Sequence, residues 1–317
     1  MITKKASKLL VTLLAVMLWQ SSAAVQAADA YSQIVTFGDS VTDPGNAFVL
    51  HHTSSVPPFN LVPDAPYARG GHHFSNGPTW VEQLGEELHL KHSTGPAWKE
   101  PVRAWNYAVA ASRARAVGPI YLGTQVGRFL SDSGGVAPAD ALYVIHIGGE
   151  DLRDALVALQ TDPSGLTSFA ILGDALSAMQ ANIVALIAAG ARTFVVPNAP
   201  DLSPIPEVRL AGPAAQAAGQ FLAASFNAYL EALLSGLEAA LPVKIFQLDI
   251  FALTDEVVSA PAAHGLTDVQ DPCITPFTLT HPYCSHPDQF LFWDGIHPTR
   301  VGHGFITDLA VSVLAGP

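Results

Sequence analysis

Short apolar runs alternate with longer amphipathic segments along this 317-residue chain. Each apolar run is rich in Val, Ile and aromatic residues and is bounded by Gly, Pro, Asn or Asp, as is typical of buried parallel strands. The five predicted strands are 34–37, 104–108, 142–147, 193–197 and 244–248. The helices predicted between and after them are 79–90, 171–189, 214–241 and 299–314. This alternation indicates an α/β domain with a doubly wound, five-stranded parallel sheet.

Polar residues follow three of the predicted strands. Ser40 comes just after the first strand, Asn106 lies near the end of the second, and Glu150 follows the third. Because the carboxyl ends of parallel strands meet at one edge of a sheet, we expect these residues to lie close together there. The long irregular segments 47–78 and 259–289 are expected to form the rim of that site.

The N-terminal segment 1–27 reads as a signal peptide rather than as part of the fold. Three lysines precede an apolar run over 9–18, and Val25-Gln26-Ala27 places small residues at the −3 and −1 positions for cleavage. The apolar run is too short to span a membrane, which needs about 20 residues. We therefore predict an exported protein, periplasmic or secreted, whose residues 28–317 form a single domain without a transmembrane anchor.

The charge balance narrows the range of partners. Charged residues make up 13% of the chain and apolar residues 49%, which leaves ample material for a buried sheet. Removal of residues 1–27, which carry three lysines and no acid, moves the formal charge from −12 to −15. Such an acidic protein is not expected to bind nucleic acid or anionic lipid through electrostatic attraction. The sequence does not indicate an oligomeric state.

Two cysteines, Cys273 and Cys284, both lie in the exported part of the chain. An oxidising compartment makes a disulfide between them the expected state. The alternatives are two free thiols or, less favoured, a metal site, which two cysteines alone do not make. A bridge here would close the Pro- and Thr-rich segment that precedes Asp294 and His297.

Ser40, Asp294 and His297 supply the groups of a serine hydrolase. Ser40 sits in the run Phe37-Gly38-Asp39-Ser40 at a strand-to-loop turn, where rigid backbone can expose a nucleophile. Asp294 and His297 are spaced i, i+3 just before the C-terminal helix, so both side chains can approach Ser40 from one short turn. A serine hydroxyl is a weak nucleophile until an imidazole takes its proton, and a carboxylate fixes the imidazole tautomer. The competing interpretation is a helix-start aspartate beside an unrelated histidine.

With these motifs in place, the chain resembles the GDSL esterases and lipases of the SGNH hydrolase superfamily. It is similar to the exported bacterial branch related to thermolabile haemolysin and to acyltransferases. The matching blocks, which extend the resemblance over about 32–315, are 37–46, 74–80, 106–111, 147–151 and 284–299.

The resemblance implies a flavodoxin-like, three-layer α/β/α SGNH fold and a set of roles. Ser40 would be the nucleophile, His297 the general base and Asp294 its orienting partner. No cofactor and no metal are implied. The expected reaction is hydrolysis of small-molecule or lipid carboxylic esters through an acyl-serine intermediate. We expect short or medium acyl chains, including lysophospholipid or choline esters, because no long amphipathic lid helix is evident.

Two positions depart from the family pattern at the oxyanion hole, which the resemblance assigns to Ser40, Ala111 and Glu150. Ala111 stands where the family has glycine, and it retains its backbone N–H. Glu150 stands where the family has an asparagine donor, and an ionised carboxylate offers only acceptors. Three interpretations stay open. Glu150 is protonated and donates its O–H, or it turns away from the hole, or the protein is an attenuated member that binds esters and turns them over poorly.

Other residues are weaker candidates for a role at the site. Trp293, next to Asp294, is a candidate substrate contact. The histidine pairs at 51–52 and 72–73 are expected to be solvated loop residues rather than metal ligands, because adjacent histidines point in different directions. Arg113 and Arg115, just past the second block, are expected to form ion pairs near the rim of the site.

Overall fold

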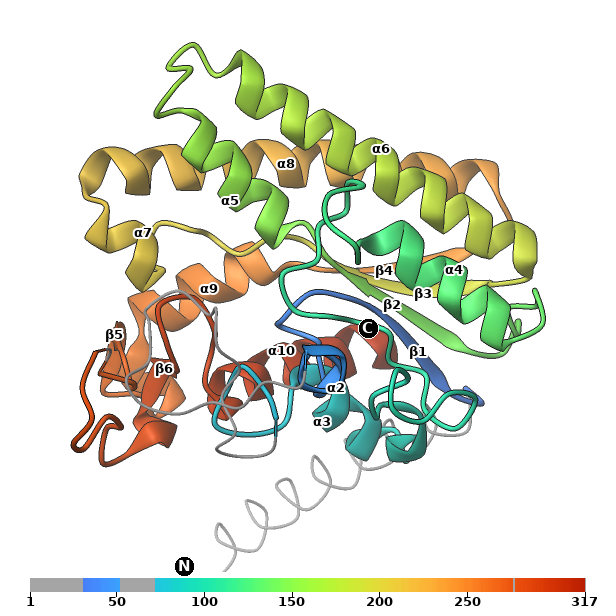
Figure 1. The fold of residues 1–317 in the computed structure, drawn as a ribbon, viewed down its shortest axis with the longest axis horizontal. Helices are drawn as coiled ribbons and strands as arrows, with labels where there is room; N and C mark the ends of the chain where they lie inside the picture. Colours follow the sequence, from blue (N-terminus) through green and yellow to red (C-terminus); the bar gives the residue numbers. More distant parts are fainter. Residues whose placement is uncertain (1–30, 52–71, 276, 317) are drawn as a thin grey trace, which may run out of the picture.

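A computed structural model describes residues 31–51, 72–275 and 277–316 of the chain (Figure 1). Its main sheet has four parallel strands in the order β1-β2-β3-β4, and a second sheet pairs β5 with β6. The strands are β1 (Ile34–Gly38), β2 (Leu142–His146), β3 (Thr193–Pro197), β4 (Lys244–Leu248), β5 (Asp268–Pro272) and β6 (Phe290–Phe292). The predicted signal peptide, residues 1–27, lies outside the described residues.

Helices connect the parallel strands and cover both faces of the main sheet. They are α2 (Asn46–His51), α3 (Trp80–Glu87), α4 (Leu122–Asp132), α5 (Gly149–Ala158), α6 (Leu166–Ala189), α7 (Pro206–Leu210), α8 (Pro213–Ala240), α9 (Ile250–Ser259) and α10 (Arg300–Ala315). Short 3₁₀ segments are η1 (Lys91–Ser93), η2 (Pro261–His264) and η3 (Pro287–Gln289). The predicted helices near α3, α6, α8 and α10 are confirmed, whereas α2, α4, α5, α7 and α9 were not predicted.

Two hydrophobic cores lie on opposite faces of the sheet, as the doubly wound prediction requires. Val35 and Phe37 of β1 belong to the larger core beneath α4, α5, α6 and α8. Ile34 of β1 and Val144 of β2 belong to the second core, beneath α3 and α10. Successive strand residues point to opposite faces, so a strand covered on both faces is apolar at nearly every position. The resulting architecture is a three-layer α/β/α domain.

The structure has four strands in the main sheet where five were predicted. Residues 104–108 do run parallel to β1, where Thr36 N–H donates to Trp105 O over 2.9 Å and Tyr107 N–H donates to Thr36 O over 2.8 Å. Their pairing is limited to an isolated bridge between Thr36 and Asn106, because the side chain and backbone of Asn106 also bond to neighbouring loops. The segment therefore lines the edge of the sheet without forming a strand of its own.

The segment 259–289 is more ordered than the sequence suggested. It contains η2, β5 and η3, and β5 pairs in parallel with β6 just before Asp294. The predicted Cys273–Cys284 disulfide is present. The other predicted rim, 47–78, holds part of α2, and its residues 52–71 lie outside the described residues.

Helix α6 is long and apolar enough to cross a membrane by length and composition alone, and it is the one such helix in the described part of the chain. In the fold it packs against α4, α5 and α8. Leu172, Met179, Ile183 and Leu186 are buried on that face. Its apolar character therefore serves the larger core.

Candidate active site

The turn after β1 holds Ser40 in a closely packed setting. A Cβ at position 38 would come within 2.2 Å of Thr42 Oγ1 and 2.4 Å of the His146 carbonyl oxygen, so only glycine fits there. The Gln125 side chain of α4 accepts the Gly38 N–H over 2.9 Å and donates to the Gly38 carbonyl over 2.8 Å. These contacts fix the backbone two residues before Ser40.

Ser40, His297 and Asp294 form a continuous hydrogen-bonded row. His297 Nε2 lies 2.7 Å from Ser40 Oγ, and His297 Nδ1 lies 2.7 Å from Asp294 Oδ2. The Asp294 carboxylate can accept only, so Nδ1 carries the proton and Nε2 is free to accept the serine hydroxyl proton. The structure thus brings together the three residues that the sequence singled out from opposite ends of the chain.

A short turn stabilises the two members of the row that lie near the C-terminus. Asp294 Oδ1 accepts the backbone N–H of Ile296 over 2.8 Å and that of His297 over 2.7 Å. Thr299 then caps α10, because its side chain accepts the Gly302 N–H. The spacing i, i+3 is therefore the geometry of a tight turn that ends where the helix begins.

Ala111 adopts a left-handed backbone conformation, with φ of 63°. Glycine takes this conformation freely, whereas alanine pays a conformational cost there. Position 111 therefore needs positive φ, which explains the glycine expected from the resemblance. In the described part of the chain, the N–H groups of Ser40 and Ala111 donate no hydrogen bond to another residue.

Glu150 lies in the first turn of α5, where two arginines flank its carboxylate. Its Oε2 is 3.5 Å from Arg113 Nη2 and 3.7 Å from Arg153 Nη1, and the side chain is 12% exposed. Arg113 also forms a bidentate ion pair with Asp154, in which Nε donates to Oδ2 over 2.7 Å and Nη2 donates to Oδ1 over 2.8 Å. Arg115 pairs with Asp151 over 2.7 Å and with Asp154, so both arginines make the ion pairs expected of them.

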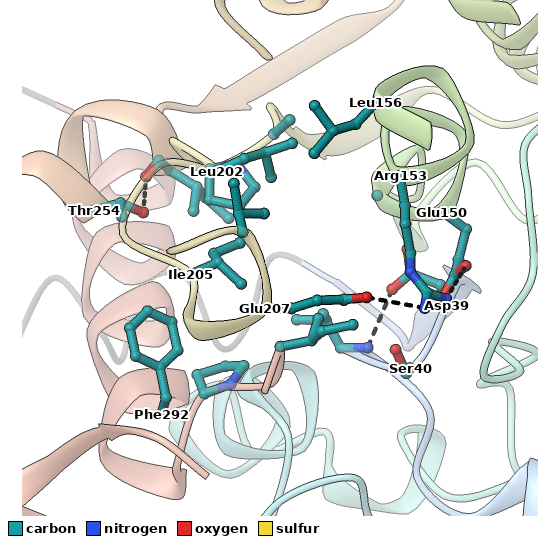
Figure 2. A pocket seen from close by; sticks show the side chains of 18 of the residues that line it. Asp39, Ser40, Glu150, Arg153, Leu156, Leu202, Ile205, Glu207, Thr254 and Phe292 are labelled. Atoms are coloured by element: carbon teal, nitrogen blue, oxygen red, sulfur yellow. Dashed lines mark hydrogen bonds and ion pairs between the residues drawn. The ribbon is translucent and has the colours of Figure 1, made fainter. Parts of the chain in front are cut away.

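A cavity of about 650 Å³ opens beside Ser40 (Figure 2). Figure 2 shows that its two ends differ: Asp39, Ser40, Glu150, Arg153 and Glu207 gather at one end. The rest of the wall is mostly apolar and comes from α5, α7, α8, α9, α10, β6 and the loops beside them. The apolar side chains in this wall include Leu156, Leu202, Ile205, Val208, Leu253, Val257, Phe292, Ile296 and Phe305. A pocket of this size suits a small-molecule ligand with an extended apolar part.

The surroundings of the polar end shift the pKa values of His297 and Asp39. Burial opposes protonation of His297, but the Asp294 carboxylate, aided by Asp39 and Glu150, outweighs burial and raises the pKa of His297. Burial raises the pKa of Asp39 to about 7, against a partial opposing effect of the Val41 N–H. The negative charge of Glu150 adds to the rise in the Asp39 pKa. Perturbed titrations of this kind concentrate at functional sites.

Trp293 and His73 are placed differently from the sequence-based expectation. Trp293 is fully buried and stacks on Tyr283 with ring centroids 5.6 Å apart, in a small core that includes both cysteines. It is not among the described residues that line the cavity, so the structure places it in this small core rather than at the cavity wall. His73 is buried rather than solvated, and its Nε2 lies 3.0 Å from Glu82 Oε1. His72 stacks on Phe48, and His52 lies outside the described residues.

Sequence reasoning missed Gln125, Arg153 and Glu207. Glu207 and Arg153 form a hydrogen bond of 3.1 Å at the polar end of the cavity. Glu207 also donates its backbone N–H to the Gly295 carbonyl over 2.9 Å, which ties α7 to the turn that carries Asp294 and His297. The one available signal was the spacing of Arg153, a cation one helical turn after Glu150. Nothing in the sequence pointed to the apolar wall, because its residues are scattered over many elements.

The comparisons with known proteins agree with the site. The profile of the family described as GDSL-like lipase/acylhydrolase matches residues 34–310, which is most of the chain. The protein therefore belongs to the GDSL lipase/acylhydrolase family, as the motifs predicted. Membership places it among the carboxylic ester hydrolases.

Individual relatives are distant but cover most of the chain. A thermolabile hemolysin of Vibrio parahaemolyticus is 24% identical over 306 residues, which are 92% of this chain and 65% of the hemolysin. This chain therefore spans slightly less than two thirds of that relative. A GDSL esterase/lipase of Arabidopsis thaliana is 29% identical over 310 residues, 86% of each chain. A phosphatidylcholine-sterol acyltransferase of Aeromonas hydrophila is 26% identical over 341 residues, 92% of this chain and 93% of the acyltransferase.

Solved structures resemble the fold more loosely. A lipolytic G-D-S-L family member from Veillonella parvula aligns with a TM-score of 0.45 and 12% identity, over 88% of this chain and 96% of that one. An acetylxylan esterase of Geobacillus stearothermophilus aligns with a TM-score of 0.46 and 14% identity, over 90% and 95%.

Proposed function

We propose that this protein is a serine esterase that hydrolyses carboxylic esters with an extended apolar acyl chain through an acyl-Ser40 intermediate. The observation that carries the proposal is the row Ser40–His297–Asp294 at the polar end of a largely apolar cavity. Nucleophile, base and orienting carboxylate lie within hydrogen-bond reach of one another, as this chemistry requires.

The proposed reaction follows from the geometry of the row. Ser40 Oγ attacks the ester carbonyl carbon while its proton passes to His297 Nε2, and Asp294 stabilises the imidazolium that forms. The imidazolium then gives the proton to the leaving alcohol. Water repeats the sequence on the acyl-serine and releases the acid. The N–H groups of Ser40 and Ala111 support the proposal as oxyanion donors, because neither donates to another described residue.

The cavity favours longer acyl chains than the sequence suggested. The expectation of short or medium chains rested on the lack of a recognisable lid helix. The cavity is built instead from side chains of several helices and has a volume of about 650 Å³. We propose that the acyl chain lies along this apolar wall and that the ester group lies at the polar end of the cavity, beside Ser40.

The contacts of Glu150 argue against the interpretation in which it is protonated and donates its O–H. Its carboxylate sits beside the guanidinium groups of Arg113 and Arg153, in the arrangement of an ion pair. We propose that Glu150 functions as an ion-paired carboxylate rather than as an O–H donor. The attenuated alternative, a protein that binds esters and turns them over slowly, is favoured by one observation only: an acceptor stands where the family has a donor.

Export remains part of the proposal. A disulfide in the described residues fits an oxidising compartment, and the N-terminal segment has the pattern of a signal peptide. We propose a periplasmic or secreted enzyme whose substrates are small-molecule or lipid esters.

Hydrolysis of p-nitrophenyl butyrate and octanoate by the wild type and by Ser40→Ala tests the proposed function. Removal of the nucleophile should lower kcat by about 10⁴- to 10⁶-fold, as for other serine hydrolases. Ser177→Ala is a matched control, because Ser177 is exposed on α6 and its hydroxyl donates to the Gly173 carbonyl of the same helix. Retention of turnover by Ser40→Ala contradicts the proposal. Measurable binding of octanoate ester with a wild-type kcat no higher than that of Ser40→Ala would favour the attenuated alternative.

A further inference from the structure

Arg153 reaches from the second turn of α5 back toward the position of Glu150. Helical side chains lean toward the helix N-terminus, so a long side chain at position 153 covers the first turn, where Glu150 lies. Figure 2 shows Arg153 between Glu150 and Glu207 at the Ser40 end of the cavity. The side chain is 35% exposed and lines the cavity, so its guanidinium group is accessible to a bound ligand.

The guanidinium group keeps donors available. It has five N–H donors, and in the described part of the chain one of its nitrogens, Nη2, makes a hydrogen bond, to Glu207 Oε1 over 3.1 Å. The 3.7 Å separation between Nη1 and Glu150 Oε2 is longer than a hydrogen bond. Glu150 therefore attracts Arg153 by charge without occupying its donors.

Two elements hold this guanidinium group in place. Glu150 belongs to α5, on the same helix face as Arg153, and Glu207 belongs to α7. The Glu207 N–H also donates to the Gly295 carbonyl, within the turn that carries Asp294 and His297. Arg153 is thus positioned relative both to the helix that follows β2 and to the turn that carries the histidine.

The proposed reaction needs a third donor at this end of the cavity. The tetrahedral intermediate carries a negative oxygen, for which Ser40 and Ala111 supply two backbone N–H groups. The residue at position 150 cannot supply the third as a carboxylate. A cationic donor stabilises an oxyanion more strongly than a neutral amide does, and arginine keeps its proton throughout.

We propose that Arg153 supplies the third oxyanion donor, and that Glu150 and Glu207 are positioning residues that hold its guanidinium group beside Ser40. The inference rests on the proposed esterase function. When the bond between Ser40 Oγ and the carbonyl carbon forms, the carbonyl π pair moves to oxygen and Arg153 donates a hydrogen bond to it. The Ser40 proton goes to His297 and later to the departing alcohol as the carbonyl re-forms. The guanidinium group keeps all its protons throughout.

A double-mutant cycle between Arg153→Met and Glu150→Asn tests this role with p-nitrophenyl octanoate. Arg153→Met should lower kcat by about 10²-fold and leave KM within threefold, because a donor to the oxyanion acts in the transition state. Glu150→Asn introduces an amide donor at the same end of the cavity. In the Glu150→Asn background, Arg153→Met should therefore lower kcat by less than tenfold. A loss below tenfold in the native background, or an equal loss in both backgrounds, overturns the proposal.

The matched control for the cycle is Arg128→Met. Arg128 pairs with Asp132 on α4 and does not line the cavity, so its loss removes a partly buried arginine without touching the site. Its kcat should stay near that of the wild type. Thermal unfolding of each variant checks the fold.

A transition-state analogue provides a second measurement that needs only the single variant. An octyl trifluoromethyl ketone adds to Ser40 Oγ and places an oxyanion at the same position. Arg153→Met should raise its inhibition constant by the same factor by which kcat/KM falls, and an unchanged inhibition constant overturns the proposal. A wild type that neither hydrolyses esters nor binds the ketone would refute the proposed function itself, whereas an active wild type with an equally active Arg153→Met refutes only the role of Arg153.

Discussion

His297 combines full burial with several negative neighbours. Burial lowers the tendency of an imidazole to take up a proton, yet Asp294, Asp39 and Glu150 together raise the pKa of His297 above its ordinary 6.5. The neutral ring is the form that accepts the Ser40 proton. Activity should therefore fall as the pH drops through the raised pKa of His297.

The charge of Glu150 should affect the pH at which His297 becomes protonated. Glu150→Gln removes one of the negative charges that raise the His297 pKa, so the acid limb of kcat/KM should move to lower pH. A pH profile between 4 and 9 with p-nitrophenyl octanoate, recorded for the wild type and Glu150→Gln, measures the shift. An acid limb that stays in place or moves to higher pH contradicts the account.

At the scale of elements, the sequence predicted the segments whose structure depends on a local pattern of residues. Continuous apolar runs predicted β1–β4, because strands covered on both faces are apolar throughout. The motif spacing placed Ser40, Asp294 and His297, because each motif is local in sequence. The cavity and Arg153 were not foreseen, because they arise from packing between α5, α7, α8, α9 and α10. The edge segment 104–108 has strand-like composition, but loop contacts at Asn106 limit its pairing.

The apolar wall should control acyl-chain preference. Each buried methylene contributes about 0.8 kcal/mol, so kcat/KM should rise about fourfold per methylene from acetate until the cavity is full. Ala215→Phe on α8 places a ring in the cavity and should lower activity on long chains while sparing acetate. Ala224→Phe is the matched control, since Ala224 is exposed on the same helix and does not line the cavity. The measurement is kcat/KM for p-nitrophenyl esters from acetate to palmitate, and a flat or falling series in the wild type would contradict an acyl site.

For the molecule as a whole, the active site carries a cost in stability that depends on pH. Asp39 is buried next to the nucleophile, and its pKa in the folded protein is about 7, against an ordinary 3.8. The folded state therefore holds this proton more tightly than the unfolded chain does. Linkage then makes Asp39 reduce the free energy of unfolding as the pH rises from about 4 to about 7.

Asp39→Asn should remove this dependence, because the amide does not titrate and its oxygen can still accept the Val41 N–H. Relative to the wild type, the variant should gain free energy of unfolding as the pH rises from 4 to 7, and the difference should level off above 7. Urea unfolding at one-unit pH intervals measures it, with the exposed Asp308→Asn as the control. If the free energy of unfolding changed with pH in the same way for Asp39→Asn and the wild type, Asp39 would not be the cause of the pH dependence.

The central claim is that Ser40 is the nucleophile, and covalent labelling tests it most directly. Intact-protein mass spectrometry after incubation with an alkyl fluorophosphonate should show one adduct on the wild type, which peptide mapping places on Ser40. Ser40→Ala should remain unlabelled, and His297→Ala should be labelled far more slowly, because the base is missing. An adduct on another residue, or no adduct on an enzyme that still hydrolyses esters, would contradict the account.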